Sequence, residues 1–271
     1  MARSDRIEAD LTGFIVANEF FGERYHFIRK QVEEVSKISY EIVGVVGALE
    51  LERRPDCCDV STLSSGQIGC ALSHLNAYKA MVDRGIKQAV VVEDDASLPP
   101  DFDKIVSGVA RQLREGEIIS LHSPTMGESK FSSNDSFSVG VSNVLTPFEA
   151  RFVRSTLCYI IDIEAARRIL AVNQPVRFVA DDFNSFWNHG CMKYVRIASP
   201  SLVLVEPFKS TIGYLDPGSA KYLVSNFLNK LPITKQILRT RRRKLRLARE
   251  LNHISVPDVS PLAAGNPNYE E

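Results

Sequence analysis

Apolar and polar positions alternate between strand-like and helix-like spacing over the first part of the chain. Residues 13–17 and 40–46 are rich in aromatic and β-branched side chains, which is typical of buried strands. Between them, residues 27–35 repeat apolar side chains at the spacing of one helix face. A strand, a helix and a second strand in this order form the unit of a parallel sheet, so the pattern predicts an α/β fold.

A longer helix and another buried strand follow. Ser64 or Ser65 is expected to cap a helix that runs to about Arg84, and Gly85 is expected to end it. Residues 89–92, Ala-Val-Val-Val, are wholly apolar and predict a strand that is buried on both faces.

The rest of the chain contains shorter patterns, some typical of helices and others typical of strands. Helices are expected after Pro99 and Pro100, to about Leu113, and over residues 163–172. Strands are expected over residues 117–121, 152–162, 194–197 and 202–205. Residues 130–144 are rich in Ser, Asn and Gly, and we expect them to form a mobile or substrate-facing insertion.

Composition narrows the class of protein. The chain has 271 residues, of which 44% are apolar and 24% charged, as in ordinary globular proteins. No apolar run approaches the roughly 20 residues of a membrane-spanning helix. Residues 1–10 carry charges of both signs and do not resemble a signal peptide. Five cysteines without a Cys-x-x-Cys pair argue against a disulfide framework and against a structural zinc site.

The formal net charge is zero, but basic residues are concentrated near the C-terminus. Residues 230–249 contain nine Lys or Arg and no Asp or Glu, with apolar residues between them. Such a helix suits an anionic membrane surface, a nucleic-acid patch or a solvated face. Its amphipathic pattern favours the membrane surface, and its lack of aromatic residues weakens the nucleic-acid interpretation. We therefore expect a main domain over residues 1–228 and a basic helical segment with a flexible tail over residues 229–271.

Several signature motifs are absent. The chain has no Walker A loop, no Gly-x-Gly-x-x-Gly, no His-Glu-x-x-His and no Gly-x-Ser-x-Gly. ATPase, dinucleotide-binding and serine-hydrolase functions therefore lose the motifs that usually mark them.

The strongest local signal for chemistry is the triplet Glu93-Asp94-Asp95. It directly follows an apolar strand, and ligands of open α/β sheets bind beyond the carboxyl ends of the strands. Three adjacent carboxylates are unfavourable there unless a cation or a basic group compensates their charge. Mg²⁺ prefers carboxylate oxygens and often holds a substrate phosphate at the same time. The pattern favours a metal-assisted site for a phosphate-containing substrate.

Five further residues are candidates for the same site. Ser73 and His74 could donate hydrogen bonds to a phosphate or a ribose, or could be a capped or partly buried pair on the helix. His122 stands at a strand end and could line the same cleft or be structural. Asp181 or Asp182 could be the general base for a hydroxyl nucleophile, with the other residue capping a helix.

The chain resembles glycosyltransferase family 25, which contains bacterial lipooligosaccharide galactosyltransferases and collagen galactosyltransferases. Residues 66–78, Gly-Gln-Ile-Gly-Cys-Ala-Leu-Ser-His-Leu-Asn-Ala-Tyr, followed by residues 89–95, Ala-Val-Val-Val-Glu-Asp-Asp, look like the signature of that family. Weaker similarities lie in residues 18–29, 155–170 and 180–183. The resemblance covers about residues 13–210.

The resemblance implies a GT-A-like, Rossmann-type mixed sheet flanked by helices, with the basic segment as an extension. It implies a UDP-sugar donor, and Asp95 as a ligand of Mn²⁺ or Mg²⁺. Either Asp181 or Asp182 would take the proton from an acceptor hydroxyl. The donor-binding residues implied are Arg24, Gly69, Ser73, His74, Glu93 and Asp94.

The function implied is inverting transfer of a hexose, with galactose expected, to lipooligosaccharide, lipopolysaccharide or a related surface glycan. We expect a cytoplasmic enzyme, held on the inner face of the bacterial inner membrane by residues 230–249, with no nucleic-acid partner. Two alternatives stay open. A metal-dependent nucleotidyltransferase or phosphohydrolase would use the same carboxylates. A non-catalytic glycan-binding relative would be indifferent to Asp95→Asn.

Overall fold

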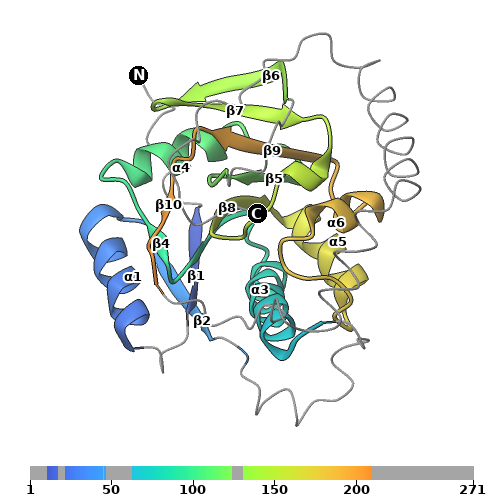
Figure 1. The fold of residues 1–271 in the computed structure, drawn as a ribbon, viewed down its shortest axis with the longest axis horizontal. Coiled ribbons are helices and arrows are strands. Elements are labelled where there is room, and N and C mark those ends of the chain that lie inside the picture. Colours follow the sequence, from blue (N-terminus) through green and yellow to red (C-terminus); the bar gives the residue numbers. More distant parts are fainter. Residues whose placement is uncertain (1–10, 18–21, 45, 47–62, 124–130, 209–271) are drawn as a thin grey trace, which may run out of the picture.

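A mixed sheet of eight strands lies at the centre of the computed structural model, which describes residues 11–17, 22–44, 46, 63–123 and 131–208 (Figure 1). Within these residues the strand order is β2-β1-β3-β8-β5-β9-β7-β6. The strands are β1 Thr12–Ala17, β2 Tyr40–Gly44, β3 Gln88–Glu93, β5 Glu117–Ser120, β6 Phe131–Val139, β7 Ser142–Pro147, β8 Cys158–Asp162 and β9 Tyr194–Ser199. The predicted α/β class is confirmed.

The first three strands of the order form a parallel set, as the strand–helix–strand pattern predicts. β1 pairs in parallel with β2 on one side and with β3 on the other. The helix α1, Gly22–Val35, lies between β1 and β2 in the chain, and α3, Ser65–Asp83, precedes β3. All three strands therefore end at the same edge of the sheet, where Glu93 is the last residue of β3.

The sheet changes direction at β8, which lies between β3 and β5 and is antiparallel to both. The start of β8 therefore lies beside the carboxyl ends of its two neighbours. The backbone N–H of Glu93 donates to the carbonyl oxygen of Leu157 at 2.9 Å, and that of Leu121 donates to Cys158 at 2.9 Å. This arrangement brings the residues just before β8 to the edge where the acidic triplet begins.

For the described part of residues 130–144, the structure shows a hairpin of the sheet where a mobile or substrate-facing insertion was expected, and whether this hairpin faces a substrate stays a prediction. This part belongs to the hairpin β6–β7, and β7 pairs with β9. Phe131 and Leu145 are buried, and the Arg196 guanidinium donates to the carbonyl oxygen of Asp135 at 3.0 Å. The pattern was misleading because these strands lie at the border of the sheet, where Ser and Asn can alternate with the few apolar residues that face the core.

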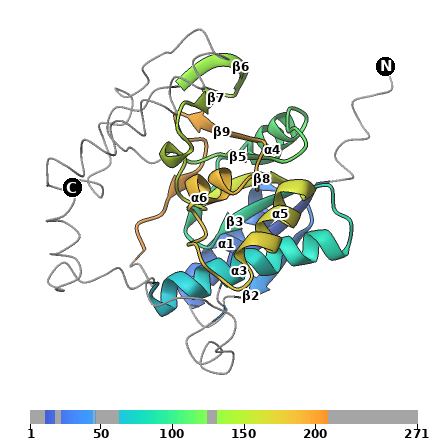
Figure 2. The same ribbon diagram turned by 90° about the vertical axis from the view of Figure 1, so that its right-hand side faces the viewer.

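Helices cover both faces of the sheet (Figures 1 and 2). The helices α1 and α4, Phe102–Ala110, lie over one face. The helices α3, α5, Ile163–Asn173, and α6, Phe183–Asn188, lie over the other. Each face buries its own hydrophobic core, with Ile28 of α1 in one and Leu75 of α3 in the other.

Local capping fixes where α3 begins and ends. Of the two predicted serines, Ser64 is the cap: its hydroxyl accepts the Gln67 backbone N–H at 3.2 Å, and the Gln67 side chain accepts the Ser64 N–H at 2.9 Å. Gly85 follows the helix with a φ of +67°, a conformation that favours glycine, as predicted. These two ends set which residues of α3 face the sheet edge.

A small second sheet places the last described residues next to the acidic triplet. β4, Ala96–Ser97, pairs antiparallel with β10, Leu204–Val205. Next to it, the backbone N–H of Glu206 donates to the carbonyl oxygen of Asp95 at 2.8 Å. The segment after β9 therefore returns to the carboxyl end of β3.

The predicted boundary at residue 228 and the basic segment 230–249 lie outside the described residues, so both stay predictions. Among the helices that the structure does describe, none combines the length and the hydrophobicity that crossing a membrane requires.

Candidate functional site

The acidic triplet forms the centre of the site. Glu93 ends β3, and Asp94 and Asp95 occupy the turn before β4. The side chains of Glu93 and Asp95 are each 22% exposed and that of Asp94 is 11% exposed. The three carboxylates are thus mostly buried but still reachable at the edge of the sheet where ligands of α/β proteins usually bind.

Arg24, from the first turn of α1, holds two of these carboxylates together. Its Nη2 lies 2.5 Å from Asp94 Oδ1 and 2.8 Å from Asp95 Oδ2. The ring of Phe208 stands against the same guanidinium, 5.8 Å from its carbon to the ring centroid. The structure therefore brings together three residues that the sequence placed in one site and that lie some seventy positions apart.

The two carboxylates next to Asp95 bring more negative charge than the single positive charge of Arg24 neutralises. Burial raises its pKa to about 7, the charges of Glu93 and Asp94 act in the same direction, and Arg24 opposes them. Its Oδ1 is buried without a hydrogen-bond partner among the described residues. An acidic group with an unused acceptor atom and a raised pKa is well matched to a cation.

Glu93 is held in a different way. Its Oε1 lies 3.0 Å from His74 Nε2 and also accepts the Thr156 hydroxyl. Burial alone would raise its pKa, but the His74 and Thr156 contacts and the charge of Arg24 outweigh burial, so the pKa lies below its ordinary value. Glu93 is therefore ionised at neutral pH, whereas the Asp95 carboxyl group, with a pKa of about 7, is partly protonated there.

His74 belongs to a chain of buried hydrogen bonds. Its Nδ1 lies 2.8 Å from the hydroxyl of Tyr159, which in turn lies 2.6 Å from the hydroxyl of Tyr78. Both ring nitrogens of His74 thus have partners, and the residue is 1% exposed. The contact with a donor that was predicted for His74 stays a prediction, because what the geometry shows is that His74 positions Glu93.

Ser73 and Gly69 face the interior of the fold. The Ser73 hydroxyl donates to the Gly69 carbonyl oxygen at 2.7 Å and accepts the Val46 backbone N–H at 3.1 Å. A Cβ on Gly69 would lie 2.3 Å from the Val46 carbonyl oxygen. The donor-binding roles predicted for these two residues stay untested, and the contacts give each of them a structural reason to be there.

Gly69→Ala is expected to destabilise the fold by about 2–3 kcal/mol, because a Cβ cannot fit against a backbone carbonyl and α3 must shift. Urea unfolding measures this loss. Gly44→Ala is the matched control, since a Cβ there meets nothing within 4 Å and the change should stay within about 0.5 kcal/mol. Equal stability of the two variants would mean that α3 does not pack this closely.

The structure separates the two candidate bases. Asp182 caps α6: its carboxylate accepts the Ser185 backbone N–H at 2.9 Å and the Ser185 hydroxyl at 2.6 Å. Asp181 accepts only a longer bond, from the Ser155 N–H at 3.3 Å. Burial raises the pKa of Asp181, and the charge of Glu93 raises it further, which links Asp181 electrostatically to the acidic triplet.

His122 contributes a second unused acceptor. Its Nδ1 lies 3.0 Å from the Val203 carbonyl oxygen, so Nδ1 carries the proton and Nε2 presents a lone pair. That Nε2 is buried without a partner among the described residues. Burial lowers the pKa of His122, which keeps the ring neutral, although the charge of Glu93 acts in the opposite direction.

Four residues of this region were not predicted from the sequence: Tyr78, Thr156, Tyr159 and Phe208. Thr156 and Tyr159 lie in the segment 155–170 that resembles the family, which was a signal, though one that assigned them no role. Tyr78 has the spacing of an ordinary apolar position of α3. Phe208 follows the last clear strand, and nothing in the local sequence indicates that the chain returns to Arg24.

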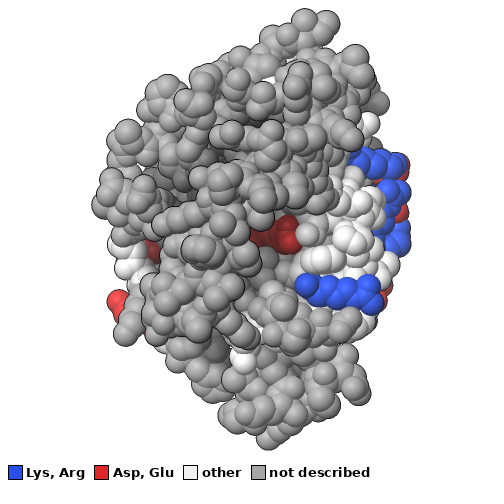
Figure 3. All heavy atoms as spheres, turned by 45° about the vertical axis from the view of Figure 1, so that its right-hand side comes forward, with Lys and Arg blue, Asp and Glu red and all other residues white. Residues whose placement is uncertain are grey.

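On the face drawn in Figure 3, Asp or Glu atoms are visible near the centre, next to an area of described residues without charged side chains, and the visible Lys and Arg side chains lie to one side of them.

The residues fit a hard divalent cation. Asp95 offers an unpartnered carboxylate oxygen, and the neighbouring Glu93 and Asp94 supply further oxygen atoms of the kind that Mg²⁺ and Mn²⁺ prefer. The raised pKa of Asp95 comes first from burial and then from the charges of Glu93 and Asp94, and a bound cation would favour the ionised carboxylate against both effects.

Residues 22–184 match the model of a known family, described as Glycosyltransferase family 25 (LPS biosynthesis protein). The matched segment contains Arg24, the acidic triplet and both Asp181 and Asp182.

Individual relatives are more distant. Procollagen galactosyltransferase 2 of Homo sapiens is 28% identical over 133 residues, which cover 46% of this chain and 20% of that protein. Inactive glycosyltransferase 25 family member 3 of Mus musculus is 29% identical over 119 residues, covering 42% of this chain and 19% of that protein. The chain thus spans about a fifth of the length of these relatives. Since one bears the name of an enzyme and the other is called inactive, overall identity does not decide whether this chain is catalytic.

Among solved structures, mannose-1-phosphate geranyltransferase from Thermus thermophilus is similar with a TM-score of 0.36 and 9% identity. The match covers 69% of this chain and 73% of that one. A score this low carries no weight for function.

Proposed function

The chain belongs to glycosyltransferase family 25, and on this premise we propose that it is an inverting, metal-dependent galactosyltransferase with a GT-A-like fold and UDP-galactose as donor. Similarity to a procollagen galactosyltransferase supports galactose as the sugar. The family's description as an LPS biosynthesis protein supports a bacterial surface glycan as the acceptor. The observation that carries the catalytic proposal is the cluster of Arg24 with Asp94 and Asp95 at the carboxyl end of β3.

In this proposal the acidic triplet and Arg24 bind the donor diphosphate. Asp95, with Asp94 and Glu93, would hold Mn²⁺ or Mg²⁺, which when bound supplies positive charge against the departing UDP. Arg24 adds a second positive charge at the same edge, and a guanidinium is well suited to phosphate oxygens. Its Nε–H is buried and has no partner among the described residues.

His74 acts on the donor indirectly in this account, as a positioning residue. By contacting Glu93, together with Thr156, it keeps that carboxylate ionised and in one orientation. His122 contributes the buried Nε2 lone pair, which can accept a hydrogen bond from a sugar hydroxyl.

Asp181 is the proposed catalytic base. Its carboxylate makes one long hydrogen bond, and its raised pKa makes it a better proton acceptor than an ordinary aspartate. The Asp182 carboxylate is already engaged by Ser185 at the start of α6, so its lone pairs are less available. The general base takes the proton of the acceptor hydroxyl as that oxygen attacks the anomeric carbon from the face opposite to UDP.

Release of UDP from UDP-galactose with Mn²⁺ tests this function. We expect release that rises at least tenfold when lipopolysaccharide core oligosaccharides or other glycans are added, since a hydroxyl acceptor replaces water. Hydrolysis of UDP-galactose to UMP and galactose 1-phosphate without any acceptor would instead identify a phosphohydrolase, and release of pyrophosphate from UTP and a sugar 1-phosphate would identify a nucleotidyltransferase. No turnover of any UDP-sugar, together with retained UDP binding, would identify a non-catalytic member.

A further inference from the structure

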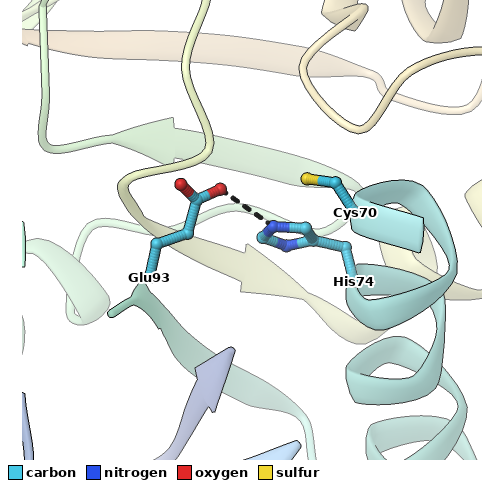
Figure 4. Close-up of side chains that lie close together, drawn as sticks. All are labelled: Cys70, His74 and Glu93. Atoms are coloured by element: carbon cyan, nitrogen blue, oxygen red, sulfur yellow. Dashed lines mark hydrogen bonds and ion pairs between the residues drawn. The ribbon is translucent and has the colours of Figure 1, made fainter. Parts of the chain in front are cut away.

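A second group of possible metal ligands lies beside the oxygen-rich triplet. Cys70, His74 and Glu93 each offer one ligand atom, and these three atoms all lie within 4.8 Å of one another. Figure 4 shows the side chains converging from α3 and from the end of β3. Cys70 and His74 are four positions apart on one helix, so they point to the same side, and Glu93 closes the third corner.

The spacing suits a tetrahedral ion after a small movement. With metal–ligand bonds of about 2.0–2.3 Å, the ligand atoms of a tetrahedral zinc site lie roughly 3.3–3.8 Å apart. His74 Nε2 and Glu93 Oε1 are already 3.0 Å apart. All three ligand atoms lie within 4.8 Å of one another, about 1 Å beyond the upper end of this range, so the movement that an ion would require is small.

The surroundings supply the outer contacts that metal sites use. A ligating histidine normally donates its second N–H to a neighbouring acceptor. Here, with Nε2 on the ion, His74 Nδ1 would donate to the Tyr159 hydroxyl, 2.8 Å away, and Tyr159 is further held by Tyr78. The Thr156 hydroxyl already donates to the Glu93 carboxylate, which fixes that ligand as well.

The charges around the thiol attract a cation. Burial raises the pKa of Cys70, and the carboxylates of Glu93, Asp181, Asp95 and Asp94 raise it further. The free thiol is therefore protonated, so it is not a reactive nucleophile, and a bound ion would displace its proton. Cys70 is only partly buried, which leaves a path for the ion.

From this geometry we propose that Cys70, His74 and Glu93 form a site for a single thiophilic divalent ion such as Zn²⁺, separate from the all-oxygen site at Asp94 and Asp95. Thiolate and imidazole ligands favour Zn²⁺ over Mg²⁺ and Mn²⁺, so the two sites select different ions. Three protein ligands leave a fourth position open for water. Glu93 is the one residue that both sites share, and an ion held by Cys70 and His74 draws this carboxylate away from the donor side.

Titration of the full-length protein with Cd²⁺, a spectroscopic substitute for Zn²⁺, tests the site by the ultraviolet charge-transfer absorption of a cadmium–thiolate bond. We expect one equivalent of Cd²⁺ to bind with this absorption, and competition by Zn²⁺ but not by Mg²⁺. Cys70→Ser should lose the absorption and bind at least tenfold more weakly. Cys70→Ala gives the same answer if the serine variant folds poorly, and circular dichroism checks the fold of both.

Two control variants make the assignment specific. Cys191→Ser should keep the absorption, because Cys191 lies in the turn after α6 and is not part of the cluster. Tyr159→Phe should keep the absorption but weaken binding about tenfold, since it removes the acceptor for His74 Nδ1, together with the hydrogen bond to Tyr78, and leaves the thiolate ligand in place. If folded Cys70 variants keep the absorption, or if the wild-type protein shows none at millimolar Cd²⁺, the proposed site does not exist.

Discussion

Asp95→Asn is expected to lower transfer of the sugar at least about 100-fold and, at the same time, to stabilise the folded protein. In the proposed mechanism Asp95 holds the ion and the donor, so removing its charged oxygen should cost more than the 10- to 100-fold typical of altering a ligand's neighbours. The gain in stability follows from the crowding of Glu93, Asp94 and Asp95 around one arginine. Replacing a residue that serves function at the expense of stability has this combined effect, a loss of activity and a gain of stability.

The pH dependence of this gain has a definite sign. The pKa of Asp95 is raised from 3.8 to about 7 by folding, so between these values the folded protein holds a proton that the unfolded chain has lost. Stability contributed by the neutral carboxyl is therefore complete below about pH 4 and is lost as the pH rises toward 7. Three pKa units correspond to at most about 4 kcal/mol. Because the variant also weakens the contact with Arg24, we expect a net gain of roughly 1–3 kcal/mol at pH 8.

Urea unfolding of wild type and Asp95→Asn at pH 5 and pH 8, without divalent ions, measures this effect. The difference should be larger at pH 8. Asp83→Asn is the control, because this exposed carboxylate pairs only with Lys79 on the surface of α3 and its loss should change stability by less than about 0.5 kcal/mol at either pH. A variant that is less stable than wild type at pH 8 would show that Asp95 is a structural partner of Arg24.

Asp181→Asn is expected to lose activity while keeping its stability, and Asp182→Ala is expected to lose stability while keeping its activity. Asp181→Asn should lower kcat by about 10²- to 10⁴-fold with little change in KM for the donor, since a general base acts in the chemical step. Asp182→Ala should lower stability by about 1–2 kcal/mol through loss of the α6 cap, while the folded fraction stays active.

The pH profile of kcat adds a readout that a structural role would not affect. The base must be ionised, and its raised pKa places the acidic limb of the wild-type profile above the range of an ordinary aspartate. Asp181→Asn should abolish this limb, and Asp182→Ala should keep it. If instead Asp182→Ala, measured where it is folded, loses as much kcat as Asp181→Asn and also loses the limb, the two roles are reversed.

The sequence predicted the position of the acidic edge because that edge is encoded locally. A wholly apolar strand must be buried, so the three carboxylates that follow it at once must lie at the end of that strand. The helix before it is marked equally clearly by its capping residues. Arg24 was a candidate only through the resemblance to the family, as a donor-binding residue, and its ion pairs with Asp94 and Asp95 were not predicted. The fold explains them, because the first helix of a parallel unit starts at the edge where the strands end.

The direction in which individual side chains point could not be predicted. Ser73 and His74 are adjacent, yet the hydroxyl of Ser73 bonds Gly69 and Val46 while His74 reaches Glu93, because their positions around α3 differ by about 100°. The choice between Asp181 and Asp182 depended on where α6 begins, to within one residue. Tyr159 joins the network through a strand far along the chain, which local spacing does not reveal.

Relatives similar to this chain include a procollagen galactosyltransferase and an inactive family member. In this chain Arg24, the acidic triplet and Asp181 are all present and lie in one region. The central claim is therefore that this edge of the sheet binds a UDP-sugar with the help of a divalent ion.

Thermal unfolding with UDP-galactose tests that claim most directly, because a ligand that binds only the folded protein must raise its Tm. With Mn²⁺ present, saturating UDP-galactose should raise Tm by several degrees, and EDTA or Asp95→Asn should remove most of the shift. A Tm that no UDP-sugar changes, with or without Mn²⁺, would contradict the assignment of this edge as the donor site.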